Sequence, residues 1–249
     1  MFIGNIHIFW YVGIGLLGLF VGRIVGLANK NLPEHKPIFS KEIVKEYLKT
    51  TEANYTIMAI TCILYIALLR VIGMSDLTEL FQYIILIPML ICAFCIDYKL
   101  QIIPNRLTLT MLECGIVFSF LRGINNLNVA VEMWAGMILG VFIFATITYV
   151  GNLIFKKETM GFGDVKLMAA LGLFFGWRNI IAISILSFLI AAIFSVCIIV
   201  KNKIKKTDIT EFIPFGPFIV MASFLVMLIP LNIWIRLIFV AFSFGKYSF

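Results

Sequence analysis

Residues 179–200, NIIAISILSFLIAAIFSVCIIV, contain no charged side chain. A helix needs about 20 mostly apolar residues to cross the hydrocarbon core of a bilayer, and this stretch is long enough. Similar runs recur along the chain, which predicts an all-α, polytopic bundle of about eight transmembrane helices with short loops. The predicted spans are residues 6–28, 54–73, 79–97, 107–122, 129–154, 165–177, 179–200 and 213–230, and a shorter apolar piece at 232–244 is a partial or interfacial span.

The composition supports a membrane protein. Of the 249 residues, 62% are hydrophobic and 13% are charged, and the mean hydropathy is +1.06. A soluble domain would carry roughly a quarter charged residues, so lipid is the expected solvent. We expect residues 1–249 to form a single transmembrane domain. The first apolar segment lacks a basic leader and a cleavage site of small residues, so we expect it to remain as a helix.

The basic residues predict the orientation. The net charge is +7, but the charges lie between the apolar runs, which argues against nucleic-acid binding. With the N-terminus outside, 16 of the 20 Lys and Arg residues fall on the inner side, as the positive-inside rule requires. The polar segment 29–53 then faces the cytoplasm, and its apolar residues recur at the spacing of a short amphipathic helix on the membrane surface.

Five cysteines lie within or next to apolar segments. Cys92 and Cys95 form a C-x-x-C pair inside LIPMLICAFCI, where a zinc site would need two further ligands. We therefore interpret them as small hydrophobic residues and predict no metal site.

Asp97 ends the third predicted span, in CAFCIDYKLQIIPNRLTL. Such an aspartate is often only the first residue of a loop. The residues that follow make a stiff turn, since Pro104 fixes its own φ and restricts Ile103 to an extended shape. Asn105 is then placed to cap the next helix.

Asp164 begins the sixth predicted span, in ETMGFGDVKLMAALGLFFGW. Gly161 and Gly163 flank Phe162, so the backbone here can take positive φ and can be approached closely. The simpler interpretation is that Asp164 is only a helix N-cap. Lys166 is either an interfacial lysine whose ammonium reaches the membrane surface or a group that stabilises charge at the aspartates.

The two aspartates together favour catalysis. Two crossings separate Asp97 from Asp164, so both lie at the same membrane face. Two neighbouring carboxyl groups cannot both ionise cheaply and should share a proton near neutral pH. Such a pair can hydrolyse a peptide: one carboxylate takes a proton from water while the other polarises the scissile carbonyl. The chain contains only two histidines and no metalloprotease, serine hydrolase or phosphate-loop motif.

Two further features stand out. Pro214, Phe215, Gly216 and Pro217 precede the last predicted span, either as an ordinary helix start or as a rigid apolar corner that grips a substrate segment. Glu113 lies two turns into the fourth span, where a charge is costly, so we expect it to be protonated or paired with a helix neighbour.

The ordered set of motifs resembles the type IV prepilin peptidase family. It comprises Asp97 with Ile103-Pro104-Asn105, then Gly161-Phe162-Gly163-Asp164-Val165-Lys166, then Pro214-Phe215-Gly216-Pro217-Phe218. The segment GLLGLFVGRIVGLANKNLP is similar to that family's glycine-rich entry helix. The resemblance implies an intramembrane aspartic peptidase of the G-x-G-D type in the cell membrane, with Asp97 and Asp164 as the catalytic pair and no cofactor for cleavage. Its substrates would be prepilins and pseudopilins, cut on the cytoplasmic side after a glycine between a basic leader and an apolar helix.

One departure from the family concerns methyl transfer. Many members carry two C-x-x-C pairs in the first cytoplasmic loop, bind zinc there, and N-methylate the new amino terminus with S-adenosylmethionine. Residues 29–53 contain no cysteine, which excludes that zinc site and argues against methyl transfer without excluding it. S-adenosylmethionine is expected only if that activity is retained. Gly22-Arg23 also stands where the family more often has Gly-Ser.

The main alternative is a proton-coupled transporter, because transporters also use intramembrane carboxylates and helices broken by glycine or proline. A purely structural assembly protein is a third possibility. Both aspartates are predicted at helix ends and not at the bilayer midplane, and the two halves show no repeat, which favours the peptidase. The oligomeric state and the particular prepilin stay open.

Overall fold

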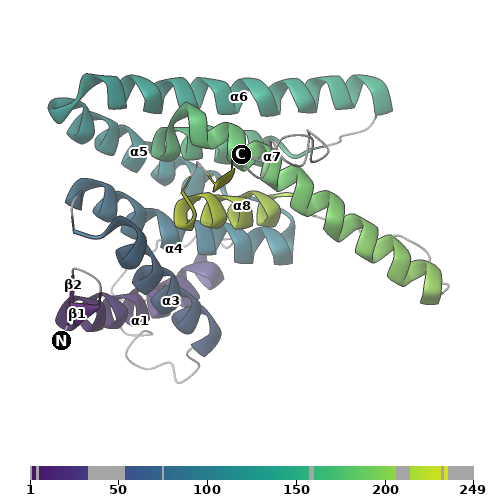
Figure 1. The fold of residues 1–249 in the computed structure, drawn as a ribbon. Helices are drawn as coiled ribbons and strands as arrows, with labels where there is room; N and C mark the ends of the chain where they lie inside the picture. Colours follow the sequence, from purple (N-terminus) through teal and green to yellow (C-terminus); the bar gives the residue numbers. More distant parts are fainter. Residues whose placement is uncertain are drawn as a thin grey trace, which may run out of the picture. The chain divides into compact units, whose positions relative to one another are not determined.

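The computed structural model describes residues 2–3, 6–32, 54–74, 76–156, 160–205, 214–230 and 233–234. A two-residue antiparallel pair, β1 (Phe2–Ile3) and β2 (Ile6–His7), precedes the first helix. The long helices that follow are α1 (Ile8–Asn31), α3 (Tyr55–Ile72), α4 (Leu77–Leu100), α5 (Asn105–Asn125), α6 (Leu127–Phe155), α7 (Phe162–Lys205) and α8 (Gly216–Leu228) (Figure 1).

Among these residues, six helices are long and apolar enough to cross a membrane. They are α1, α3, α4, α5, α6 and α7, whereas α8 has 13 residues. The protein is therefore a multi-pass membrane protein, and the secondary structure of its described residues is helical apart from the short β pair. The count of eight spans and the orientation remain predictions. Residues 33–53 of the predicted amphipathic loop, and most of the apolar piece 232–244, lie outside the described residues.

The chain divides into two compact units, residues 1–131 and 132–249. In the first unit α1 packs on α3 and α4, and α4 also packs on α3 and α5. The hydroxyl of Tyr65 on α3 donates a hydrogen bond of 2.7 Å to the carbonyl oxygen of Ile84 on α4. In the second unit α8 packs on α7. The prediction of one domain over residues 1–249 is not tested by this division and stays a prediction.

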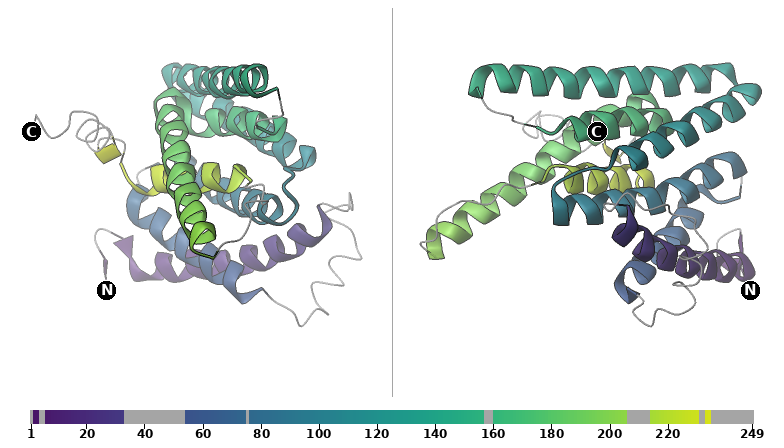
Figure 2. Two further views of the ribbon diagram at one scale, coloured as in Figure 1. Left: turned by 90° about the vertical axis from the view of Figure 1, so that its right-hand side faces the viewer. Right: turned by 180° about the vertical axis from the view of Figure 1, so that it is seen from behind.

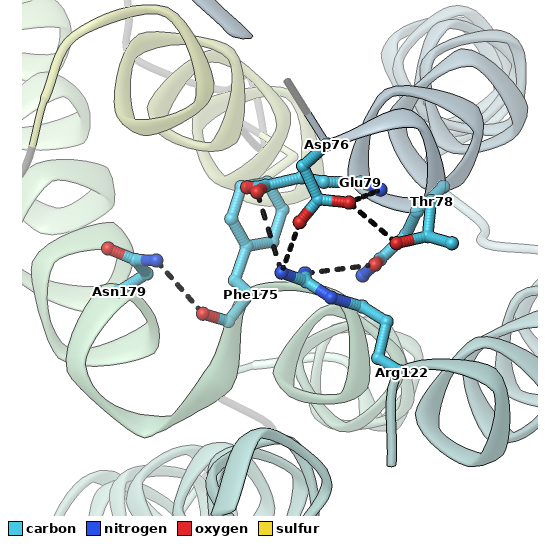
Figure 3. A network of polar contacts seen from close by, with 7 residues as sticks. Asp76, Thr78, Glu79, Arg122, Phe175 and Asn179 are labelled. Carbon is cyan, nitrogen blue, oxygen red and sulfur yellow. Dashed lines mark hydrogen bonds and ion pairs between the residues drawn. The ribbon is translucent and has the colours of Figure 1, made fainter. Parts of the chain in front are cut away.

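A polar network joins the first turns of α4 to the last turn of α5 (Figure 3). The guanidinium of Arg122 donates to Gln82 Oε1 at 3.2 Å and lies 3.4 Å from both Asp76 Oδ2 and Glu79 Oε2. Asp76 also caps α4, since its Oδ1 accepts the Glu79 backbone N–H at 3.0 Å and the Thr78 hydroxyl at 2.6 Å. Gln82 is fully buried. These contacts hold α4 and α5 together at the end of α4 opposite Asp97.

A break divides α7 at Gly176, which has φ 73° and ψ 170°. Only glycine adopts this backbone conformation without strain. The Asn179 side chain donates to the Phe175 carbonyl oxygen at 2.9 Å, which satisfies an acceptor next to the break. The helix is kinked at this residue, and the ribbon of α7 changes direction along its length (Figures 1 and 2). The predicted spans 165–177 and 179–200 meet close to this point, and the structure places the break between them at Gly176.

Candidate active site

Asp97 lies in the last turn of α4, and only 5% of its surface is exposed. Its backbone carbonyl accepts the N–H of Gln101 at 2.8 Å. Gln101 has φ 56° and ψ 31°, the left-handed conformation that ends helices. The helix therefore stops one turn after Asp97, and the chain continues through buried Ile103.

The prediction that Asn105 caps the next helix was wrong. Pro104 occupies the N-cap position with φ −62° and ψ 130°, and no side-chain hydrogen bond caps this helix end. Asn105 is instead the first residue of α5. The ring of Pro104 fixes φ at a value that suits helix entry, so the chain enters α5 without a polar cap.

Asp164 is the third residue of α7, and 7% of its surface is exposed. It is therefore not the N-cap. Its backbone N–H donates to the Gly161 carbonyl oxygen at 3.1 Å. Its Oδ2 lies 3.7 Å from the point where a Cβ on Gly161 would stand, so the carboxyl group is directed back over that glycine. The free amides of the first turn favour a negative charge there.

Phe162 and Lys166 form a cation–π pair on a different side of α7 from Asp164. The Lys166 ammonium lies 5.2 Å from the centre of the Phe162 ring, and Phe162 is 67% exposed. Residues four apart share a helix face, whereas residues two apart do not. This placement fits the interfacial role of Lys166, and a role in stabilising charge at the aspartates stays a prediction.

Close backbone contact with α6 sets the position of the helix that carries Asp164. A Cβ on Gly136 would lie 2.5 Å from the Gly172 carbonyl oxygen, and a Cβ on Gly140 would lie 2.7 Å from the Met168 carbonyl oxygen. Met168 is one turn from Asp164 on the same face of α7. The sequence analysis missed this contact, although Gly136 and Gly140 on α6 have the four-residue spacing typical of close helix packing in membranes.

The proline-rich motif packs in an aromatic cluster of the second unit. Phe215 precedes α8, and its ring centre lies 5.0 Å from that of Phe188 and 6.1 Å from that of Phe144. Gly216 and Pro217 are buried and Pro214 is half-buried. These contacts join α6, α7 and α8. They support a packing role for the motif, and its contact with a substrate stays a prediction.

Asp97 belongs to the first unit and Asp164 to the second. Within the described residues, no three His, Cys, Asp or Glu side chains gather as metal ligands would. What each unit presents is one shielded carboxyl group at the end of an apolar helix, next to a loop.

The chain is similar to known proteins over its central part. Residues 84–196 match the model of the type IV leader peptidase family. A protein from Aeromonas salmonicida (strain A449) named prepilin leader peptidase/N-methyltransferase is 34% identical over 134 residues, which cover 53% of this chain and 44% of that protein. Proteins of the same name from Legionella pneumophila and Escherichia coli (strain K12) are 34% and 32% identical, covering 60% and 51% of this chain and 50% and 54% of their own length.

The chain thus spans about half the length of the curated relatives that it matches. No solved structure matches it significantly. The matched segment contains both shielded aspartates, the turn after Asp97 and the glycines around Phe162. Through residues 84–196, which carry Asp97 and Asp164, this chain is similar to the type IV leader peptidase family.

Proposed function

We propose that the protein is an intramembrane aspartic endopeptidase that removes the basic leader from type IV prepilins or pseudopilins, by cleavage after a glycine. The observation that carries this proposal is the pair Asp97 and Asp164. Both are shielded acidic residues at the ends of apolar helices, and both lie within the segment that matches the family model. Buried carboxyl groups at membrane depth are costly, and their retention favours a functional role.

In the proposed reaction, one aspartate is ionised and the other is protonated. The carboxylate takes a proton from water while the water oxygen attacks the scissile carbonyl carbon. The protonated aspartate donates its proton to the carbonyl oxygen, giving a neutral tetrahedral intermediate. The C–N bond then breaks, the amine leaves with a proton from the first aspartate, and the hydroxyl returns its proton to the second. The pair ends in its starting state and no metal takes part.

We place both aspartates at the cytoplasmic face of the cell membrane. Asp97 lies in the last turn of α4, and α5 and α6 follow before Asp164 in the first turn of α7. Two crossings return the chain to the face that it left. The distribution of Lys and Arg supports the cytoplasmic assignment, because 16 of 20 fall on that side when the N-terminus is outside.

The relatives' names also contain N-methyltransferase. We propose peptidase activity and do not assign methyl transfer, because residues 29–53 lack the cysteine pairs that the family resemblance associates with that activity. S-adenosylmethionine would be a cosubstrate only if the activity were retained. Nothing in the family match or in the named relatives supports the transporter alternative.

The proposal is tested by cleavage of a prepilin-like peptide by the protein in lipid vesicles. The peptide carries a basic leader, a glycine and an apolar helix. We expect cleavage after the glycine, loss of at least a thousandfold in rate for Asp97→Asn and Asp164→Asn, and a rate near wild type for Glu132→Gln, an acidic control in an exposed ion pair with Arg178. Cleavage by either aspartate variant at the wild-type rate would overturn the mechanism. Labelled S-adenosylmethionine in the same assay tests methyl transfer separately.

A further inference from the structure

Glu113 is an acidic residue within the membrane-spanning part of α5 that the proposed peptidase reaction does not use. It lies eight residues after Asn105, about 12 Å along the helix. Its side chain is exposed on the surface of the protein. Within the part of the chain that the structure describes, its carboxyl group makes no hydrogen bond or ion pair, so the expected helix neighbour does not pair with it there.

Glu113 belongs to a regular stripe of exposed residues along α5. Thr110, Glu113, Val117, Phe120 and Ile124 follow one another at alternating steps of three and four residues. The three apolar members are between 56% and 81% exposed. Steps of three and four residues make a continuous seam, the pattern by which two helices pack side by side along their length.

The opposite face of α5 is already used within the first unit. Its buried residues are Leu107, Thr108, Met111, Gly115, Phe118 and Ser119. At 100° per residue, Glu113 lies about 180° from the centre of that face, and α5 packs on α4. The seam is therefore an exposed face of α5, separate from the face that holds α5 in its own unit.

We propose that this seam binds the α5 seam of a second copy of the chain, so that two Glu113 side chains share a hydrogen bond inside the membrane. Lipid tails offer no hydrogen-bond partner to a carboxyl group. Copies of one protein insert in the same orientation, so a two-fold axis along the membrane normal places each residue opposite itself at the same depth.

A second copy suits this seam for a chemical reason. A protonated carboxyl group has one donor and free acceptor positions, so it pairs with its own symmetry mate. A polar residue at one seam position also fixes the register of a helix pair. Glu113 is the only acidic residue of the seam, and it lies between Thr110 and Val117, whose small side chains allow close approach of the two helices.

The experiment measures dimerisation of the full chain in lipid vesicles, by energy transfer between labelled copies over a range of protein-to-lipid ratios. We expect wild type to dimerise as its density rises. Glu113→Leu should weaken dimerisation about threefold to tenfold, the range of hydrogen bonds between membrane helices. Glu113→Gln keeps a donor and an acceptor and should stay within about twofold of wild type.

Two apolar variants provide matched controls. Phe120→Ala shortens a seam residue and should weaken dimerisation, whereas Ile138→Ala shortens an α6 residue of similar exposure, 64% against 66%, and should not. Helical content and thermal unfolding show whether each variant is folded. A wild type that stays monomeric at every density, a Glu113→Leu variant that dimerises like wild type, or an equal effect of Phe120→Ala and Ile138→Ala would each overturn the proposal.

Discussion

The carbonyl oxygen of Gly172 on α7 lies 2.5 Å from the point where a Cβ on Gly136 of α6 would stand. The two backbones are thus in direct contact, with no room for a side chain at either position. One turn closer to Asp164, a Cβ on Gly140 would lie 2.7 Å from the Met168 carbonyl oxygen. The distance between these helices is set by the absence of side chains, and it fixes where α7 presents its aspartate.

Gly172→Ala should therefore separate α6 from α7 and shift Asp164. We expect a loss of about 1–3 kcal/mol in the free energy of unfolding from overpacking. We also expect at least a tenfold lower cleavage rate, since a shift of about 1 Å at a catalytic group costs up to a hundredfold. Gly13→Ala is the control, because no atom lies within 4 Å of its added Cβ. Cleavage assays and chemical unfolding measure both effects, and a Gly172→Ala variant as active as the control would contradict the prediction.

Asp97 and Asp164 should behave as one catalytic unit. If both aspartates are needed for the same reaction step, the loss of either one already removes that step. The double variant Asp97→Asn with Asp164→Asn should then cleave at a rate within about threefold of the slower single variant. Single-turnover cleavage of the prepilin-like peptide measures the three rates. If the loss of cleavage rate in the double variant equalled the product of the losses in the two single variants, the aspartates would act independently.

Gln101 holds a left-handed conformation that glycine adopts more easily. Relief of that conformation is worth about 1 kcal/mol, and the greater freedom of glycine in the unfolded chain cancels about half of it. Gln101→Gly should therefore raise the free energy of unfolding by about 0.5 kcal/mol, whereas the β-branched Gln101→Val should lower it. Gln101→Ala keeps the strain and tests the side chain alone. If the glycine variant were less stable than the alanine variant, the left-handed backbone conformation would not be the main cause of the change in the free energy of unfolding.

The stability of the α4–α5 end should depend on the charge of Asp76. The hydrogen bond from the Thr78 hydroxyl, with smaller effects of the Glu79 amide and the Arg122 guanidinium, holds the pKa of this carboxyl group below its usual value, although partial burial opposes them. Because the pKa of Asp76 is lower in the folded state, its contribution to stability is fully present above the pKa of the unfolded state. That contribution disappears as the pH falls through the pKa of the folded state.

Asp76→Asn is the matched variant, since asparagine caps helices equally well but does not titrate. At pH 7 wild type should be more stable by about 0.5 kcal/mol, as expected for a partly exposed ion pair. The difference should vanish at acidic pH. Unfolding in detergent at several pH values measures it, and a difference that grows as pH falls would have the wrong sign.

Much of the fold could be predicted from hydropathy alone. The predicted span 54–73 corresponds to Tyr55–Ile72, and 79–97 corresponds to Leu77–Leu100. Boundaries failed where polar or glycine residues join a helix: α7 already begins at Phe162 and not at 165, because Gly163 and Asp164 are helical. Apolar length predicts where a helix crosses the membrane, but capping and turn geometry decide where it ends.

The choice of Asp97 and Asp164 as the candidate site stays a prediction from the sequence, and the geometry around them could not be predicted. Asp97 and Asp164 could be chosen from their neighbours in sequence, and the structure shows both to be shielded. The partners of Arg122 could not be predicted from the sequence, because they depend on how α4 is rotated against α5. The separation of Lys166 from the face of Asp164 follows from helical spacing and could have been predicted once the helix was known to start at Phe162.

The break at Gly176 limits the first part of α7 to Phe162–Phe175. At 1.5 Å per residue that part is roughly 21 Å long, whereas the hydrocarbon core of a bilayer is about 30 Å thick. Thinning of the bilayer around the short helix is one way to relieve such a hydrophobic mismatch. Thinning brings the aqueous phase closer to the end of α7 that carries Asp164. A short helix would in this way supply the hydrolytic water to a carboxyl group that side chains otherwise shield.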